Sequence, residues 1–277
     1  MFKRYKPFFK AGAMDLLAYK FNILTWLVVS VFEVVCIVFL WIAVYQNSSD
    51  GVNSIINGFN FKEMIAYLVF INMFTFVTFD GTTLWTINEE IKKGTITMAF
   101  TRPISYRKRF IATTLGALSV MNLMLGLPCF IIAYIVFILI EFIAVESIWI
   151  FAAHIILFFI AQLLAALIND VLNYIFGVLC FYTSSGWGIN QIKQVIVMFL
   201  SGTLVPISFF PDTIKTIVGY LPFAGMAQNP VLILLMKVDI VNSLILIGIS
   251  LFWWIVLEVF GMILFNKASK KVTVQGG

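Results

Sequence analysis

The stretch Ile111 to Ile140 reads IATTLGALSVMNLMLGLPCFIIAYIVFILI and contains no charged residue. A helix needs about 20 predominantly apolar residues to cross the hydrocarbon core of a membrane, and this stretch is longer. Lipid offers no hydrogen-bond partner to backbone groups, so a spanning segment outside a barrel must be helical. The stretch therefore predicts a transmembrane helix.

Apolar stretches of similar length recur along the chain, separated by short polar breaks. The predicted spans are Asn22 to Tyr45, Met64 to Trp85, Ile111 to Ile140, Ile148 to about Tyr182, Gln194 to Phe209 and Ile240 to Phe265. The first two are interrupted by one acid each, Glu33 and Asp80. Hydrophobic residues make up 62% of the chain and charged residues 11%, against roughly 25% charged residues in a soluble domain. We expect an all-α membrane protein with six transmembrane helices and a single transmembrane domain over residues 1–277.

The fourth predicted span is too long for a simple crossing. Its 35 residues would reach about 52 Å as a helix, well beyond a hydrocarbon core of about 30 Å. We expect either a break near Asn169, Asp170 and Asn173 or a part of the helix that projects beyond the bilayer. An alternative topology with a seventh crossing would put Lys193 outside.

The basic residues predict the orientation, because lysine and arginine in short loops are retained on the cytoplasmic side. Fifteen of the 18 lie before the first span, in the loop after the second span, at Lys193 or after the last span. Lys62, Lys215 and Lys237 are left for the opposite face. We expect both termini in the cytoplasm. The net charge of +5 then reports membrane orientation, and nucleic acid need not be invoked as a partner.

Residues 1–20 predict an amphipathic helix that lies in the membrane interface. Apolar residues recur at helical spacing beside a basic stripe. The apolar residues are Phe2, Tyr5, Phe9 and Leu16, and the basic ones are Lys3, Lys6 and Lys10. A positive signal for topology explains the same residues equally well.

The chain offers no signature of an enzyme. It contains no Gly-Lys pair, so it cannot supply the lysine of a phosphate-binding loop. The three cysteines lie in predicted spans without the spacing of metal ligands, and the single histidine, His154, stands in the apolar run FAAHIILFFI. We therefore expect no metal site, no cofactor and no catalytic residue in this chain, and a helix-packing role for His154.

Two segments carry a more specific pattern. The first, from Asn88, reads NEEIKKGTITMAFTRPISYRKRF, with paired acids, a Gly-Thr, an amphipathic turn, an Arg-Pro and a basic cluster. The second, from Phe199 to Leu235, reads FLSGTLVPISFFPDTIKTIVGYLPFAGMAQNPVLILL. Its Pro206 and Pro211 would end the fifth span early, and Thr213 to Tyr220 would form a short helix that dips back toward the membrane.

These segments resemble the coupling loop and the external re-entrant segment of ABC exporter permeases of the second membrane-domain class, the ABC-2 class. The resemblance implies a bacterial permease in the inner (plasma) membrane, with a cytoplasmic coupling loop over residues 88–109 and an external re-entrant segment over residues 210–238. It also implies ABC ATPase subunits, which hold the ATP and Mg²⁺, and a second permease protomer, either the same chain or a related one. The substrate would be an amphiphilic or hydrophobic molecule, such as a lipid-linked glycan, a peptide or a drug, moved out of the cytoplasm or the inner leaflet.

The resemblance assigns the ATPase contact to the coupling loop. Charges at Glu89 and Glu90 would fix its register, while the apolar side chains of Ile96 and Phe100 would enter a groove of the ATPase. The expected coupling residues are Glu89, Glu90, Gly94, Thr95, Ile96, Phe100, Arg102 and Pro103.

Acids inside apolar spans are costly, at about 2.5–3.5 kcal/mol for an aspartate at the helix centre on insertion scales, so they are candidates for function. The candidate residues of the translocation path are Glu33, Asp170, Asn173, Phe209, Phe210 and Glu258. A hydrogen-bonded strut between helices is the alternative for each acid. Two other classes stay open. One is an ion-coupled secondary transporter with Glu33, Asp170 and Glu258 as a proton relay, and the other is a membrane anchor or assembly factor.

Overall fold

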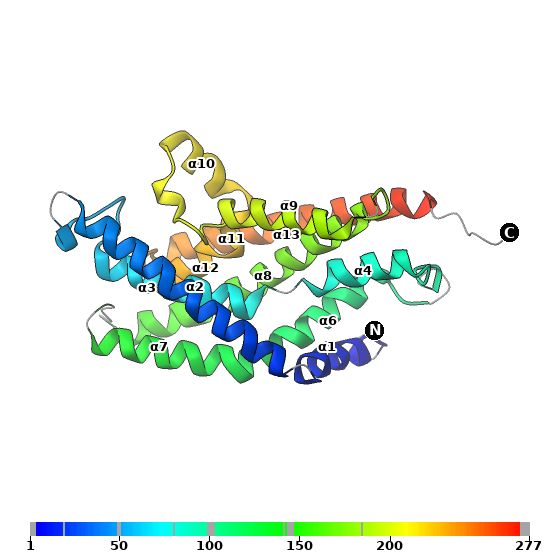
Figure 1. Ribbon diagram of the computed structural model, residues 1–277, viewed down its shortest axis with the longest axis horizontal. Coiled ribbons are helices and arrows are strands. Elements are labelled where there is room, and N and C mark those ends of the chain that lie inside the picture. The colour runs from blue at the N-terminus through cyan, green and yellow to red at the C-terminus, as the bar shows by residue number, and fades with distance from the viewer. Residues whose placement is uncertain are drawn as a thin grey trace.

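The computed structural model describes residues 4–18, 20–48, 51–79, 81–98, 103–140, 142, 147–183 and 185–271. Within these residues the protein is helical and contains no β-strand, as expected from the sequence. The helices form an elongated bundle, whose long axis is horizontal in Figure 1. α1 (Lys6–Ala18), the end of α4 (Thr82–Lys92) and the end of α13 (Ile240–Ala268) gather at one end of the bundle, which we call the loop end.

Five helical segments of the described residues are long and apolar enough to cross a membrane. They are Ile23–Gln46, Phe61–Lys92, Tyr106–Leu139, Ile148–Leu179 and Ile240–Ala268. The first lies within α2 (Lys20–Gln46), the fourth is α8 (Ile148–Leu179) and the fifth is α13. Five of the six predicted spans thus have a matching helix.

The second and third spans are each interrupted, whereas α8 and α13 are continuous. The second consists of α3 (Phe61–Thr78) and α4. Phe79, which follows α3, is extended, with φ −88° and ψ 116°. The third consists of α6 (Tyr106–Met121), the π-helical turn η3 (Asn122–Gly126) and α7 (Leu127–Leu139). π-helical turns are rare and disturb the regular hydrogen bonding of an α-helix.

α8 is one unbroken helix of 32 residues. The predicted break near Asn169, Asp170 and Asn173 is wrong, because these buried side chains find partners while the helix satisfies its own backbone. At 1.5 Å per residue the helix is about 48 Å long, which exceeds a hydrocarbon core of about 30 Å. The alternative expectation, a projecting end, agrees with this length.

The fifth predicted span, Gln194 to Phe209, is not a continuous helix. α9 (Gly186–Leu200) has 15 residues, or about 22 Å, and is too short to cross the hydrocarbon alone. The chain turns at Gly202, which has φ +83°, before Pro206 is reached. Tyr67 donates a hydrogen bond to the carbonyl of Gly202 at 2.7 Å, and a Cβ at Gly202 would lie 2.5 Å from Oε1 of Gln228. The left-handed backbone of Gly202, which favours glycine, therefore ends the helix before either proline is reached.

The segment predicted to be re-entrant contains three short helices. They are α10 (Asp212–Tyr220), α11 (Pro222–Met226) and α12 (Gln228–Leu234), and the 3-10 turn Ile207–Phe209 precedes them. α10 matches the predicted short helix and projects from the side of the bundle (Figure 1). α11 and α12 instead pack against α8, with Met226, Val231 and Ile233 fully buried.

His154 ties α8 to the segment before α13. Its Nδ1 lies 2.8 Å from the carbonyl oxygen of Ile150, and its Nε2 lies 2.9 Å from that of Val238. Both ring nitrogens thus lie within hydrogen-bond distance of a backbone carbonyl, which supports the helix-packing role expected for this residue.

Four clusters of buried apolar residues lie in the described part of the bundle. One of them, formed by Ile168, Leu172, Val197 and Met226, lies between the two that concern the candidate site. The larger packs α3, α7 and α12 around the first half of α8, and it includes Phe70, Phe130 and Phe158. The smaller lies at the loop end. It comprises Ile87, Ile96, Tyr106, Phe110, Tyr174, Val178 and Ala268. Asn169 and Asp170 lie on the stretch of α8 between the two cores.

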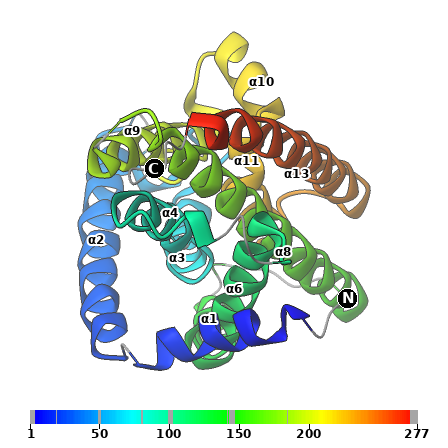
Figure 2. The same cartoon turned by 90° about the vertical axis from the view of Figure 1, so that its right-hand side faces the viewer.

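α1 packs along α6 through two glycines. A Cβ at Gly12 would overlap the carbonyl oxygen of Thr113, and a Cβ at Gly116 would overlap that of Phe9. The two backbones therefore touch, and only glycine permits this approach. Viewed from the loop end, α1 lies across α6 (Figure 2). The predicted N-terminal helix is thus docked on the third span, while Phe2 and Lys3 lie outside the described residues.

We expect Gly12→Ala to weaken the docking of α1, because its methyl group would overlap the backbone of Thr113. Overpacking of this kind costs about 1–3 kcal/mol. Gly248→Ala in α13 is the matched control, since no atom lies within 4 Å of its Cβ position. Thermal unfolding in detergent should show a lower midpoint for Gly12→Ala, and an unchanged or higher one for Gly248→Ala. Equal midpoints for Gly12→Ala and the wild type would contradict the packing.

Candidate functional site

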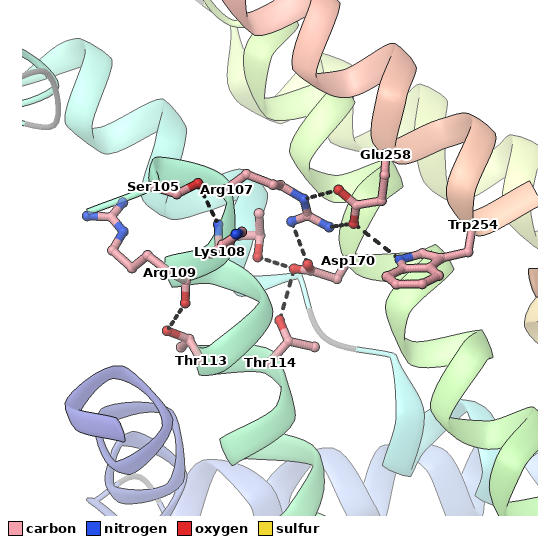
Figure 3. Close-up of polar contacts among 10 residues, drawn as sticks. Ser105, Arg107, Lys108, Arg109, Thr113, Thr114, Asp170, Trp254 and Glu258 are labelled. Carbon is pink, nitrogen blue, oxygen red and sulfur yellow. Dashed lines mark hydrogen bonds and ion pairs between the residues drawn. The ribbon is translucent and has the colours of Figure 1, made fainter. Parts of the chain in front are cut away.

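Three charged side chains from distant parts of the sequence meet inside the bundle near the loop end (Figure 3). Arg107 lies in the first turn of α6, Asp170 lies on α8 and Glu258 lies on α13. Arg107 donates from Nε and Nη2 to Glu258 at 2.9 and 2.6 Å, and from Nη1 to Asp170 at 2.6 Å. We call these three residues the Arg107 cluster.

Neutral donors complete the cluster. Thr83 of α4 and Thr114 of α6 donate to Oδ1 of Asp170 at 2.5 and 2.9 Å. Trp254 donates from Nε1 to Glu258 at 3.2 Å. The guanidinium carbon of Arg107 also lies 4.9 Å from the ring centroid of Tyr174. The cluster therefore joins four helices, α4, α6, α8 and α13.

Burial makes this cluster energetically demanding. The side chain of Arg107 is 6% exposed, that of Asp170 is 1% exposed and that of Glu258 is 12% exposed. Taking charges out of water is expensive, and only close ion pairs with further hydrogen bonds offset the cost. The bidentate contact to Glu258 and the hydroxyl donors to Asp170 meet this requirement. Because two carboxylates share one cation, loss of Arg107 would leave both without a counter-charge.

A second polar group connects the two helices that flank the predicted coupling loop. Glu90 of α4 accepts a hydrogen bond from the Tyr106 hydroxyl at 2.7 Å and from Nη2 of Arg109 at 2.9 and 3.0 Å. The guanidinium carbon of Arg109 lies 4.5 Å from the ring centroid of Phe110. Glu90 is thus an internal link between α4 and α6.

The adjacent acid has a different environment. The side chain of Glu89 is 64% exposed and pairs with Lys93 one turn along α4, at 3.0 Å. Gly94 follows the C-cap with φ +69°, a conformation that favours glycine and ends the helix. Thr95 is exposed, and so is Met98. The two predicted coupling acids therefore differ, because Glu90 is a partly buried link between helices and Glu89 is a surface charge.

Ile96 does not have the exposed position expected for an ATPase contact. It is 2% exposed and packs in the smaller core. Pro103 is exposed, whereas Phe100 and Arg102 lie outside the described residues. Met98, at 54% exposed, is instead the large apolar side chain that this surface presents among the described residues of the loop.

The candidate residues of the translocation path do not form one group. Asp170 and Glu258 belong to the Arg107 cluster, and Asn173 accepts a hydrogen bond from the buried Lys193 of α9 at 2.5 Å. Glu33 is exposed on α2. Phe209 packs edge-on against Trp41 of α2, with 5.0 Å between ring centroids, and Phe210 packs beside a small core of Ile207, Val218 and Ala224.

Arg107 and Lys193 are the polar residues that sequence reasoning misplaced. Both were counted with the basic residues of the cytoplasmic side, and the structure buries both within helices. A signal was present for Arg107, because two carboxylates in apolar spans require a cation. Ser105 is a favourable N-cap residue, and its side chain does cap α6, so Arg107 falls in the first helical turn.

Comparison with known proteins gives one match. A family model described as ABC-2 family transporter protein matches residues 31–276. The matched region includes the Arg107 cluster, Glu90 and the loop after α4. No curated protein and no solved structure matches the chain.

We expect Arg107→Met to lower the free energy of unfolding by about 3–5 kcal/mol, because it leaves two buried carboxylates without a cation. Lys108→Met is the matched control, since Lys108 is the next residue and is exposed. Its effect should stay within about 0.5 kcal/mol. Denaturant unfolding in detergent measures both variants.

The triple variant Arg107→Met, Asp170→Asn, Glu258→Gln should recover part of the loss, because a neutral cluster no longer requires a cation. Equal stability of Arg107→Met and Lys108→Met would contradict the energetic role of the cluster.

Proposed function

Because the chain belongs to the ABC-2 transporter family, whose members are membrane transport subunits that work with ABC ATPases, we propose that it is the permease subunit of an ATP-driven exporter. The observation that carries this proposal is the physical connection between the loop after α4 and the spanning helices. Glu90 links α4 to α6, and the Arg107 cluster links both of them to α8 and α13. A surface loop connected in this way can transmit force to the membrane helices.

The loop end faces the cytoplasm in this proposal, together with both termini. The basic residues support it, since Lys92, Lys93 and Lys108 are exposed at this end. The membrane is then the inner (plasma) membrane of a bacterium, and α10 with the rest of segment 210–238 lies toward the outer side.

The ATPase contact is a surface formed by Glu89, Lys93, Thr95 and Met98, with Pro103 at its edge. Glu89 and Lys93 offer charges that set register, and Met98 offers an apolar anchor. Ile96 acts from beneath this surface, because it connects the loop to the smaller core. ATP and Mg²⁺ belong to the ATPase subunits.

The translocation path runs between two permease protomers, identical or related. α2 stands at the edge of the bundle when viewed from the loop end (Figure 2). Its exposed face carries Trp26, Phe32 and Phe39 together with the acid Glu33. A face that is apolar except for one carboxylate suits an amphiphilic substrate, such as a lipid-linked glycan, a peptide or a drug. Phe209 packs against Trp41, which is buried, so it lies beside α2 and not on this exposed face.

An ion-coupled secondary transporter is less compatible with the geometry. Its proton relay would need Asp170 and Glu258 to exchange protons, but Arg107 and neutral donors occupy their oxygens. Glu33 stands apart on the exposed side of α2. Asp170 and Glu258 therefore fit a structural role in the Arg107 cluster, whereas Glu33 fits a place on the translocation path.

We expect Met98→Asp to reduce ATPase binding by about 2 kcal/mol or more, roughly thirtyfold in affinity, because it removes the apolar anchor of the contact. Glu89→Lys should weaken binding less, since it alters an exposed charge. Lys215→Glu on the exposed α10 is the control and should bind normally. Co-purification with the ATPase and ATP hydrolysis in proteoliposomes measure the effect. Normal assembly and hydrolysis in Met98→Asp would contradict this contact.

We expect Glu33→Gln to reduce transport several-fold without changing thermal stability, because the exposed carboxylate supports no internal contact in this account. Asp15→Asn on the exposed side of α1 is the control for loss of one negative charge. Transport by proteoliposomes and thermal unfolding should be measured on the same preparations. Transport at the wild-type rate in Glu33→Gln would remove this residue from the path.

A further inference from the structure

The two interrupted spans are broken at the same level of the bundle. α3 ends at Thr78, where the backbone becomes extended, and the π-helical turn begins at Asn122. The two sites touch, because a Cβ at Gly126 of the π-helical turn would lie 3.1 Å from Cγ1 of Val77. The same Cβ would lie 2.7 Å from Oδ1 of Asn122, so a larger residue at position 126 would displace the Asn122 side chain.

A single side chain on the continuous α8 bonds to both sites. Nε2 of Gln162 donates to Oγ1 of Thr78 at 3.2 Å and to Oδ1 of Asn122 at 3.1 Å. Gln162 and Thr78 are each 2% exposed. The two acceptors are the last residue of α3 and the first residue of the π-helical turn, so the amide of Gln162 holds the ends of both interruptions against α8.

The interruptions lie between the larger and the smaller apolar core, where Phe79 packs against the cluster of Ile168, Leu172, Val197 and Met226. α3 and α7 contribute to the larger core, whereas α4 and the start of α6 contribute to the smaller one. The smaller core is fixed to α8 and α13 by the charged contacts of Arg107. At the interruptions the polar contacts from α8 are neutral amide and hydroxyl bonds, which are roughly half as strong as charge-assisted ones.

We propose that Gln162 is a positioning residue that latches a hinge through the second and third spans. When the latch opens, the angles between α3 and α4 and between α7 and α6 change, while α4 and the first turns of α6 stay fixed to the Arg107 cluster. The inference adds a moving joint to the proposed transport cycle. The joint belongs to the permease chain itself, so it is measured without ATPase or substrate, and its test is independent of the proposed function.

The strength of the latch suits reversible opening. Removing one neutral hydrogen bond of the latch shifts the equilibrium between its closed and open states roughly three- to tenfold. Thr78→Val keeps the shape of the side chain and removes the acceptor on the second span. Thr75→Val is a matched control three residues earlier, because the Thr75 hydroxyl donates within its own helix, to the carbonyl of Asn72 at 3.0 Å. Gln162→Met removes both bonds at nearly constant volume.

Spin-label pairs on the full chain in lipid nanodiscs report the motion, in a background without the native cysteines. The outer pair, Lys62→Cys with Val241→Cys, joins the start of α3 to the start of α13. The inner pair, Lys92→Cys with Lys267→Cys, joins the end of α4 to the end of α13. All four positions are exposed, which favours labelling.

Pulsed electron-electron double resonance should show a shifted or broadened distance distribution for the outer pair in both Thr78→Val and Gln162→Met. The inner pair should keep the wild-type distribution in these variants, and Thr75→Val should leave both pairs unchanged. An unchanged outer pair in both latch variants would overturn the proposal. Equal changes in the two pairs would also overturn it, because they would report general loosening in place of a hinge.

Discussion

The structure depends on one electrostatic constraint, which is that Asp170 and Glu258 are buried in apolar helices and need a shared cation. Arg107 supplies it from the first turn of α6, and the contact fixes where α6 begins relative to α8 and α13. Thr83 extends the constraint to α4. Since α4 and α6 flank the loop that follows α4, charges inside the bundle help to position that loop, together with Ile96, which packs in the smaller core. The same charges give the loop its mechanical connection to the membrane helices.

The contacts along the bundle are of three kinds, and the proposed mechanism depends on their different strengths. Charged hydrogen bonds hold the loop end, neutral bonds from Gln162 hold the middle, and the larger apolar core holds the opposite half. Charge-assisted bonds are the stronger and more directional ones. In the proposed mechanism, the end that faces the ATPase stays rigid while the middle of the bundle yields. A bundle held by apolar contacts alone would not make this distinction.

Sequence reasoning identified five of the spans because lipid imposes a length and an apolarity that composition reveals directly. It also predicted the resemblance to ABC-2 permeases, and the family match over residues 31–276 confirms this prediction. It did not separate Glu89 from Glu90, because adjacent residues on a helix point about 100° apart and only the neighbouring helix decides which one finds a partner there. It assigned Ile96 to a partner for the same reason. The end of α9 and the docking of α1 depend on Gly202, Gly12 and Gly116, whose role is to admit a neighbour that lies far away in the sequence.

The central claim is that the loop end receives the ATPase and that the Arg107 cluster connects it to the spans. The most direct measurement is a cryo-electron microscopy structure of the chain purified with its ATPase, in the absence and presence of a non-hydrolysable ATP analogue. The account predicts that the ATPase lies against Glu89, Thr95 and Met98, and that Arg107 remains within hydrogen-bond distance of Asp170 and Glu258 in both states. An ATPase seated on another surface, or an Arg107 cluster that separates between the two states, would contradict it.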